Sequence, residues 1–113
     1  MCSQQQLTGI IERLIGDAKV IFGDSIHEVI LYGSYARQDS DEESDVDVMV
    51  LLDLPREQLP AYRRSIAEIS GNLLFEFGVV ISPVLESKAF FERNRETYPF
   101  FKNVDREGIR YVS

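Results

Sequence analysis

Two aspartates separated by one residue, Asp45 and Asp47, are the side chains in this sequence best suited to chemistry. Residues two apart in a β-strand point to the same side, so a strand here places both carboxylates side by side. Adjacent carboxylates repel each other, and a divalent cation between them relieves the repulsion. Magnesium is bound by one or two carboxylates together with the phosphates of a substrate. An Asp-x-Asp pair alone is also typical of solvated residues at a strand start, and that interpretation stays open.

A glycine and a serine, Gly33 and Ser34, precede this pair, with ten residues between the two motifs. A glycine at the end of a strand permits a tight turn and lets a ligand approach the main chain. N–H groups at the start of a helical turn favour an anion such as phosphate. Arg37 follows and could contact that phosphate or pair with nearby acidic residues. Gly-Ser alone is typical of a plain turn, but together the motifs predict one cleft for a triphosphate and a metal ion.

Hydrophobic periodicity predicts the elements that must position these residues. Apolar residues at steps of three and four indicate helices, with a single helical turn after Gly33, over residues 7–22, 34–38, 59–77, 87–97 and 100–107. Short β-branched runs indicate strands, at residues 28–32, 45–52 and 79–85. The acidic stretch 39–44 is predicted to be a loop. We therefore expect the α/β (α+β) class, with a small mixed sheet of three or four strands and helices against one face.

Length and composition indicate a single globular domain over residues 1–113, with 44% hydrophobic and 27% charged residues. No apolar run approaches the roughly 18 residues that cross a bilayer, so no membrane association is expected. The formal net charge is −7, and the lack of a basic face argues against direct nucleic-acid binding. A lone cysteine, Cys2, and an N-terminus without a secretory pattern predict a cytoplasmic protein.

The segment GSYAR followed by DVD resembles the G-S-x(10)-D-x-D signature of the nucleotidyltransferase superfamily typified by DNA polymerase beta. The short length resembles its minimal (MNT-type) branch, whose members are commonly antitoxins encoded beside a HEPN-domain ribonuclease toxin. The stretches ISPVLESKAFFE and PFFKNVDREGI are similar to stretches common in these proteins. The resemblance therefore covers nearly the whole chain.

The resemblance implies the nucleotidyltransferase fold and a transfer of AMP from ATP to a tyrosine of a HEPN-type toxin, which silences that toxin. Gly33 and Ser34 would hold the β- and γ-phosphates of ATP. Asp45 and Asp47 would be the catalytic residues and would coordinate one or two Mg²⁺ ions.

Two departures from the family pattern bear on activity. Gln38 replaces a glycine that usually ends the first motif, and no acid occurs where a third carboxylate would align, near Val80. Glu76 and Glu86 flank that strand, and either could reach the site. Because the third acid is the usual candidate for activating the nucleophile, the sequence leaves open a non-catalytic protein of the same fold that neutralises its partner by binding alone.

Aromatic residues gather near the C-terminus in a number that exceeds what a small core can bury. Most are expected in the core, but part of the group is predicted to form an exposed surface for homo- or hetero-oligomer contacts. The group comprises Phe90, Phe91, Tyr98, Phe100 and Phe101.

Overall fold

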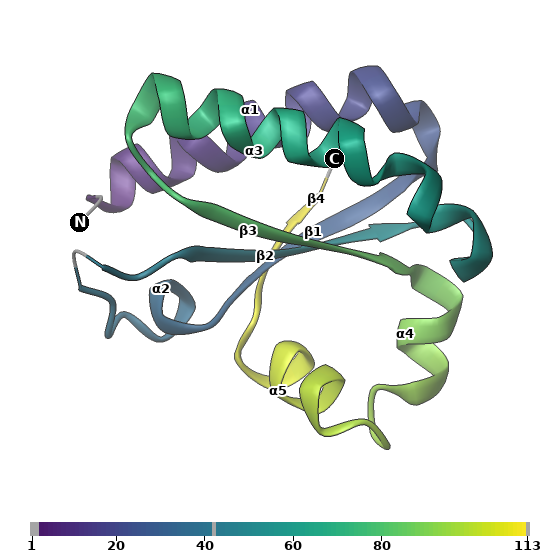
Figure 1. Cartoon of the computed structure of the whole chain (residues 1–113). Helices are drawn as coiled ribbons and strands as arrows, with labels where there is room; N and C mark the ends of the chain where they lie inside the picture. The colour runs from purple at the N-terminus through teal and green to yellow at the C-terminus, as the bar shows by residue number, and fades with distance from the viewer. Residues whose placement is uncertain (1–2, 42, 113) are drawn as a thin grey trace.

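A four-stranded sheet lies between two pairs of helices in the computed structural model, which describes residues 3–41 and 43–112 (Figure 1). The strands are β1 (Ile26–Tyr32), β2 (Val46–Leu52), β3 (Ile81–Ser87) and β4 (Ile109–Val112). The helices are α1 (Gln4–Phe22), α2 (Ser34–Arg37), α3 (Arg63–Phe77), α4 (Lys88–Asn94) and α5 (Pro99–Glu107). Short 3-10 helices cover Gly23–Ser25 and Arg56–Tyr62. Cys2, used above to predict the compartment, lies outside the described residues.

The sheet is mixed, as the sequence predicts, and its strand order is β3-β2-β1-β4. β2 pairs with β1 in the antiparallel sense and with β3 in the parallel sense, and β4 adds an antiparallel pair to β1. The link between β1 and β2 contains only the one-turn helix α2 and no full crossover helix, which suits the antiparallel pair. α3 supplies that crossover between β2 and β3. β3 lies at an edge of the sheet, where Pro83 is tolerated because it has no N–H to donate.

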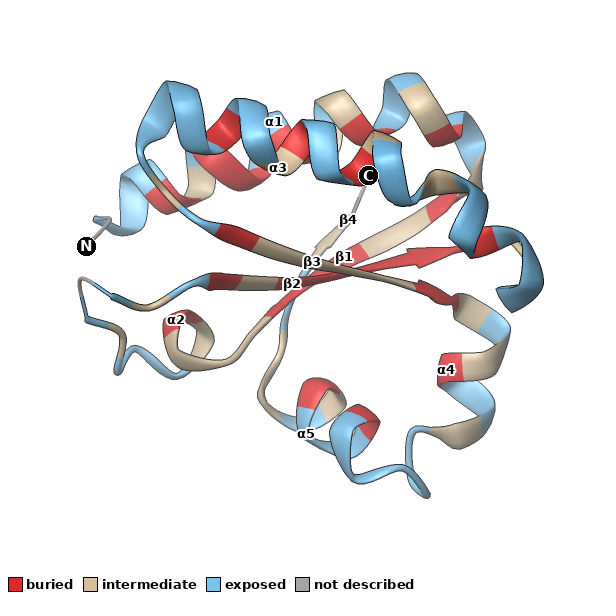
Figure 2. Cartoon of the chain, viewed as in Figure 1, coloured by how far each residue is buried: buried red, intermediate tan, exposed pale blue. Residues whose placement is uncertain are grey.

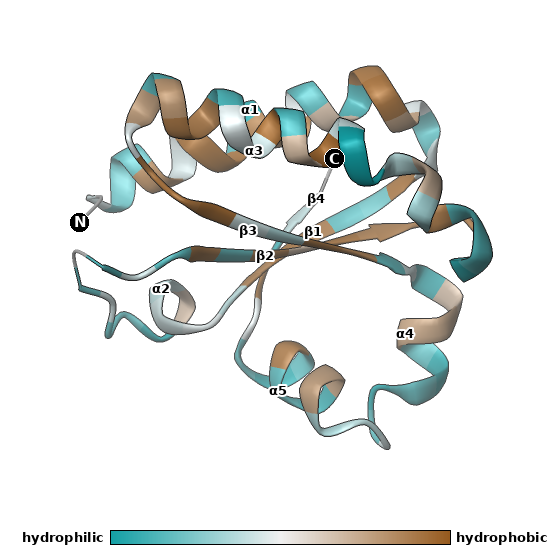
Figure 3. Ribbon diagram, viewed as in Figure 1, coloured by the Kyte–Doolittle hydropathy of each residue, from teal (hydrophilic) through white to brown (hydrophobic). Residues whose placement is uncertain are grey.

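The prediction of helices against one face is wrong, because both faces of β2 are apolar. One face of β2 packs under α1 and α3 and the other packs over α4 and α5, so the chain has two cores (Figures 1 and 2). The α1/α3 core takes Val46, Val48, Val50 and Leu52 from β2. The α4/α5 core takes Met49 and Leu51. Figure 3 shows the matching pattern along β2, which is hydrophobic over most of its length.

Several element boundaries differ from those predicted. The stripe at 59–77 divides into a 3-10 helix and α3, since Pro60 lacks an N–H for a regular α-helix. β3 begins two residues later than predicted, and α4 ends at Asn94. α1 begins at Gln4, and its N-cap Ser3 accepts with its side chain from the Gln6 amide in a capping box. In the described part of the chain, no helix has the length and apolarity needed to cross a membrane.

The C-terminal aromatic group is mostly core. Phe91 and Phe101 are buried between α4, α5 and the sheet, whereas Tyr98 and Phe100 keep 43% and 45% of their surface exposed. The rings of Phe90, Tyr98 and Phe101 contact one another at centroid distances of 5.3 to 5.9 Å. These ring contacts hold α5 against α4, and the edge-on contact of Phe100 with Tyr32 holds α5 against β1.

The junction between α5 and β4 depends on a close approach at Gly108. A Cβ atom at this position would collide with the Ile30 side chain and the Val104 carbonyl. We predict that Gly108→Ala lowers the free energy of unfolding by about 1–3 kcal/mol, the usual cost of overpacking. Urea unfolding followed by circular dichroism measures this. Gly71→Ala is the matched control, because Gly71 is exposed within α3 and has open space for a Cβ; an equal loss in both variants would contradict the prediction.

Candidate functional site

The two sequence motifs meet at one contact, between Gly33 and Asp47. Gly33 follows β1 with φ 78° and ψ −155°, a conformation that side chains other than glycine rarely adopt. A Cβ at Gly33 would lie 2.5 Å from Asp47 Oδ2, so the absence of a side chain lets the carboxylate pack against the turn. The glycine is therefore required both by its backbone angles and by its neighbour on β2.

Asp45 and Asp47 lie together on the α4/α5 side of the sheet, at the start of β2. Asp47 pairs in register with Tyr32 of β1 and with Ser82 of β3. Its pKa is raised above the ordinary 3.8 by partial burial and by the charge of Asp45, while Arg37 opposes the shift. Ser82, which stands beside Asp47 in the register, bonds to the Asp45 carboxylate, so both carboxylates lie on one side of the sheet, as predicted. Asp45 itself is exposed at the strand start.

Ser82 is the residue of β3 that enters the site, and sequence reasoning missed it. Its hydroxyl donates to Asp45 Oδ2 at 3.0 Å, and its main chain lies beside Asp47 in the parallel register. The β3 residue beside Asp47 is therefore Ser82, two residues after Val80, near which the third carboxylate of the family pattern would align. Only the register of the β2–β3 pair identifies it, because a serine in a strand carries no signal of its own.

Neither predicted substitute for a third carboxylate reaches the aspartates. Glu86 stands at the other end of β3 beside Leu51, four strand positions from Ser82 and about 13 Å away at roughly 3.3 Å per residue. It is buried and accepts two hydrogen bonds from Arg56, at 3.0 and 3.2 Å. Glu76 pairs with Arg13 of α1 at 3.0 Å, in the layer on the opposite side of the sheet. Both glutamates have structural partners elsewhere.

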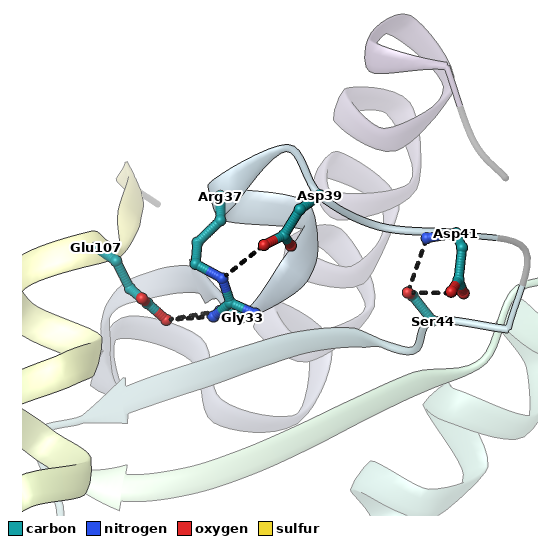
Figure 4. A network of polar contacts seen from close by, with 6 residues as sticks. All are labelled: Gly33, Arg37, Asp39, Asp41, Ser44 and Glu107. Carbon is teal, nitrogen blue, oxygen red and sulfur yellow. Dashed lines mark hydrogen bonds and ion pairs between the residues drawn. The ribbon is translucent and has the colours of Figure 1, made fainter.

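Arg37 closes the other side of the turn and bridges two carboxylates (Figure 4). Its Nε donates to Asp39 Oδ2 at 3.1 Å, and its Nη1 donates to Glu107 Oε1 at 3.2 Å. The same Glu107 oxygen accepts from the Gly33 N–H at 3.2 Å. Glu107 ends α5 and is a second site residue that sequence reasoning missed, because it follows Gly33 by 74 residues.

The acidic loop is a turn with its own hydrogen bonds, so the solvated-loop interpretation holds for residues 39–41 and 43–44. Asp41 Oδ1 accepts from the Glu43 amide at 2.9 Å and from the Ser44 hydroxyl at 3.2 Å (Figure 4). Gln38 precedes this turn with φ 63°, in the left-handed region that favours glycine. The glycine of the family pattern would fit this position without strain.

Tyr32 adds a protonated phenol beside Asp47. Burial and the charge of Asp47 together raise the pKa of Tyr32 to about 12. Its ring meets Phe100 of α5 edge-on, at a centroid distance of 5.5 Å. Tyr32 therefore keeps its proton at neutral pH and forms the floor of the site toward α5.

A cavity of about 660 Å³ adjoins Asp45 on the α1/α3 side of the sheet. Asp45 and Tyr35 lie on its wall, and Ile10 of α1 and Phe77 of α3 close it from the helical layer. Its volume falls in the range of small-molecule sites. The site thus consists of a turn, a carboxylate pair and an adjacent cavity.

The oxygen atoms at the start of β2 suit a magnesium ion that is completed by a substrate. Asp45, Asp47 and the Ser82 hydroxyl present oxygens on one side of the sheet. Among the residues that the structure describes, no group of three or more His, Cys, Asp or Glu side chains could hold a metal by itself. A cation here would complete its coordination with phosphate and water oxygens, which is the usual mode for Mg²⁺.

Sequence comparison identifies the family of the chain. The chain belongs to the nucleotidyltransferase domain family, whose profile matches residues 11–112. Two relatives from Methanocaldococcus jannaschii are each named "putative protein adenylyltransferase". One is 32% identical over 98 residues, covering 87% of this chain and 90% of the relative. The other is 35% identical over 85 residues, covering 74% of this chain and 82% of the relative.

The raised pKa of Asp47 predicts how Asp47→Asn changes stability with pH. The folded state holds the proton more tightly than the unfolded chain, so wild-type stability falls as pH rises from about 3.8 through the raised pKa. Asparagine removes that cost, and we expect Asp47→Asn to melt at or above the wild-type temperature at pH 7. The difference should shrink toward zero near pH 3. Thermal melts across this range measure it, and a variant that melts far lower at pH 7 would make Asp47 a structural residue.

Proposed function

We propose that this protein is a Mg²⁺-dependent nucleotidyltransferase that moves AMP from ATP to a tyrosine hydroxyl of a HEPN-type toxin and acts as its cytoplasmic antitoxin. The observation that supports this best is the contact of Gly33 with Asp47, which joins a phosphate-binding turn to a carboxylate pair. The names of the relatives support AMP transfer to a protein.

Each group has a role in this scheme. Asp45 and Asp47 would hold the metal, and the bound metal would supply positive charge to offset the negative charge of the phosphates. The Gly33 amide, the Ser34 hydroxyl and Arg37 bind the β- and γ-phosphates. The acceptor oxygen forms a bond to the α-phosphorus and loses its proton, while the bond from that phosphorus to pyrophosphate breaks.

The order of strands in the sheet indicates the side from which the acceptor hydroxyl approaches the α-phosphorus. In-line displacement keeps the attacking and leaving oxygens on opposite sides of the phosphorus. The pyrophosphate lies at the end of β1 near Gly33, and the aspartates lie on β2, so the acceptor approaches over β3. Ser82 is on that side, beside Asp47.

The partner is a protein that presents a tyrosine. The net charge of −7 disfavours a free polynucleotide, whose phosphates it would repel. The exposed rings of Tyr98 and Phe100 are the part of the aromatic group that a toxin, or another copy of this chain, could cover. Docking of this kind orients the acceptor, and orientation contributes several kcal/mol even when the general base is poor.

A binding-only antitoxin is the alternative, and the identity of Ser82 favours it. A serine beside the aspartates coordinates a metal less strongly than a carboxylate and is a poor base. Under this alternative, the protein binds nucleotide and toxin but does not transfer AMP.

Nucleotide binding should require the metal, because triphosphate and aspartates otherwise repel each other. Isothermal titration calorimetry with ATP is expected to show binding in Mg²⁺ and at least about tenfold weaker binding in EDTA. Asp45→Asn should abolish the Mg²⁺-dependent part and leave the melting temperature unchanged. Asp24→Asn, which removes an exposed charge in the turn before β1, is the control. Equal affinity in Mg²⁺ and EDTA would exclude the metal role.

Transfer itself is tested by the intact mass of the partner. The product of the neighbouring gene, incubated with this protein, ATP and Mg²⁺, should gain about 329 Da per AMP, slowly. Ser82→Asp restores a carboxylate beside Asp47 and should speed the gain about tenfold or more, whereas the uncharged Ser82→Asn should not. If the partner keeps its mass with both the wild-type protein and Ser82→Asp, yet is inhibited by tight binding, the result would support the binding-only antitoxin.

A further inference from the structure

Glu107 accepts hydrogen bonds from two groups that, in the proposed function, bind phosphate. A single oxygen, Oε1, accepts from the Gly33 N–H and from Arg37 Nη1, both at 3.2 Å. Figure 4 shows the glutamate reaching from the end of α5 to the turn, with Arg37 between it and Asp39. An anion of this chain therefore already occupies the phosphate side of the turn.

Carboxylate and phosphate oxygens compete for the same donors. Each accepts charge-assisted hydrogen bonds from an arginine and from backbone amides. The Gly33 amide has one proton, and that proton is directed at Glu107. A phosphate oxygen can take it in full only if the glutamate leaves.

The surroundings of Glu107 let its side chain move while its backbone stays in place. Gly108 packs too closely on Ile30 and on the Val104 carbonyl for α5 to shift easily. The Glu107 side chain is 28% exposed, so it has access to solvent beside the turn. Arg37 keeps a second partner, Asp39, which holds the guanidinium near the turn when Glu107 leaves.

We propose that Glu107 competes, within the chain, with a nucleoside triphosphate for the Gly33 amide and Arg37. It keeps the Gly33 amide and Arg37 arranged for an anion and is displaced when the polyphosphate binds. The inference rests on the proposed phosphate role of Gly33 and Arg37 and adds a residue that sets the affinity of that site. Glu107 acts on ligand affinity through these two donors and makes no contact with the reacting atoms.

Removal of the charge should tighten polyphosphate binding. We expect Glu107→Gln to bind inorganic tripolyphosphate about three- to fivefold more tightly than wild type in calorimetry with Mg²⁺, the scale of an exposed ion pair. Glu92→Gln on the exposed surface of α4 makes the same change in net charge and should bind as wild type. Equal or weaker binding by Glu107→Gln, relative to Glu92→Gln, would overturn the inference and would assign Glu107 a structural role.

A second measurement uses the unaltered protein and does not depend on how the variant folds. In NMR titrations with tripolyphosphate, the Gly33 amide and the Glu107 side-chain carboxyl resonances should shift together with one Kd. A Gly33 shift without a Glu107 shift would overturn the inference and leave the phosphate site intact. The absence of any saturable shift at Gly33 would overturn the inference together with the proposed function.

Discussion

The contact between the α-carbon of Gly33 and the carboxylate of Asp47 is the constraint on which the rest of the site depends. It requires β1 and β2 to be antiparallel neighbours, because only then does the end of one strand meet the start of the other. It requires glycine in the turn, since a Cβ would displace the aspartate. It also explains why Asp47 is partly buried and protonates more readily than a free aspartate.

β2 carries this arrangement because it is central and apolar on both faces. Its valines anchor α1 and α3, and its Met49 and Leu51 anchor α4 and α5. A strand held from both sides has little freedom to shift in register, so the two aspartates at its start are positioned by most of the hydrophobic core. The same packing places the end of α5, and with it Glu107, beside the turn.

Negative charge dominates the site. Asp39, Asp45, Asp47 and Glu107 surround a turn at which Arg37 is the nearby cation. The chain lowers the electrostatic cost by pairing Arg37 with two carboxylates and by directing Ser82 at Asp45. A divalent ion would offset the remaining repulsion between Asp45 and Asp47, and this is the physical basis of the metal binding that we propose.

The sequence by itself determined the class of fold and the identity of the two motifs, because hydrophobic periodicity and the Gly-Ser and Asp-x-Asp patterns are local signals. Helices 7–22 and 100–107, the turn after Gly33 and the strand that carries Asp47 all lie close to where periodicity predicts them. Tertiary structure alone decided the second helical layer, the strand beside β2 and the roles of Ser82 and Glu107. Ser82 enters the site through the parallel register of β3, and Glu107 enters through the packing of an aromatic helix 74 residues away from Gly33. Hydrophobic periodicity in the sequence cannot reveal either neighbour pair, because each pair depends on how distant elements pack against one another.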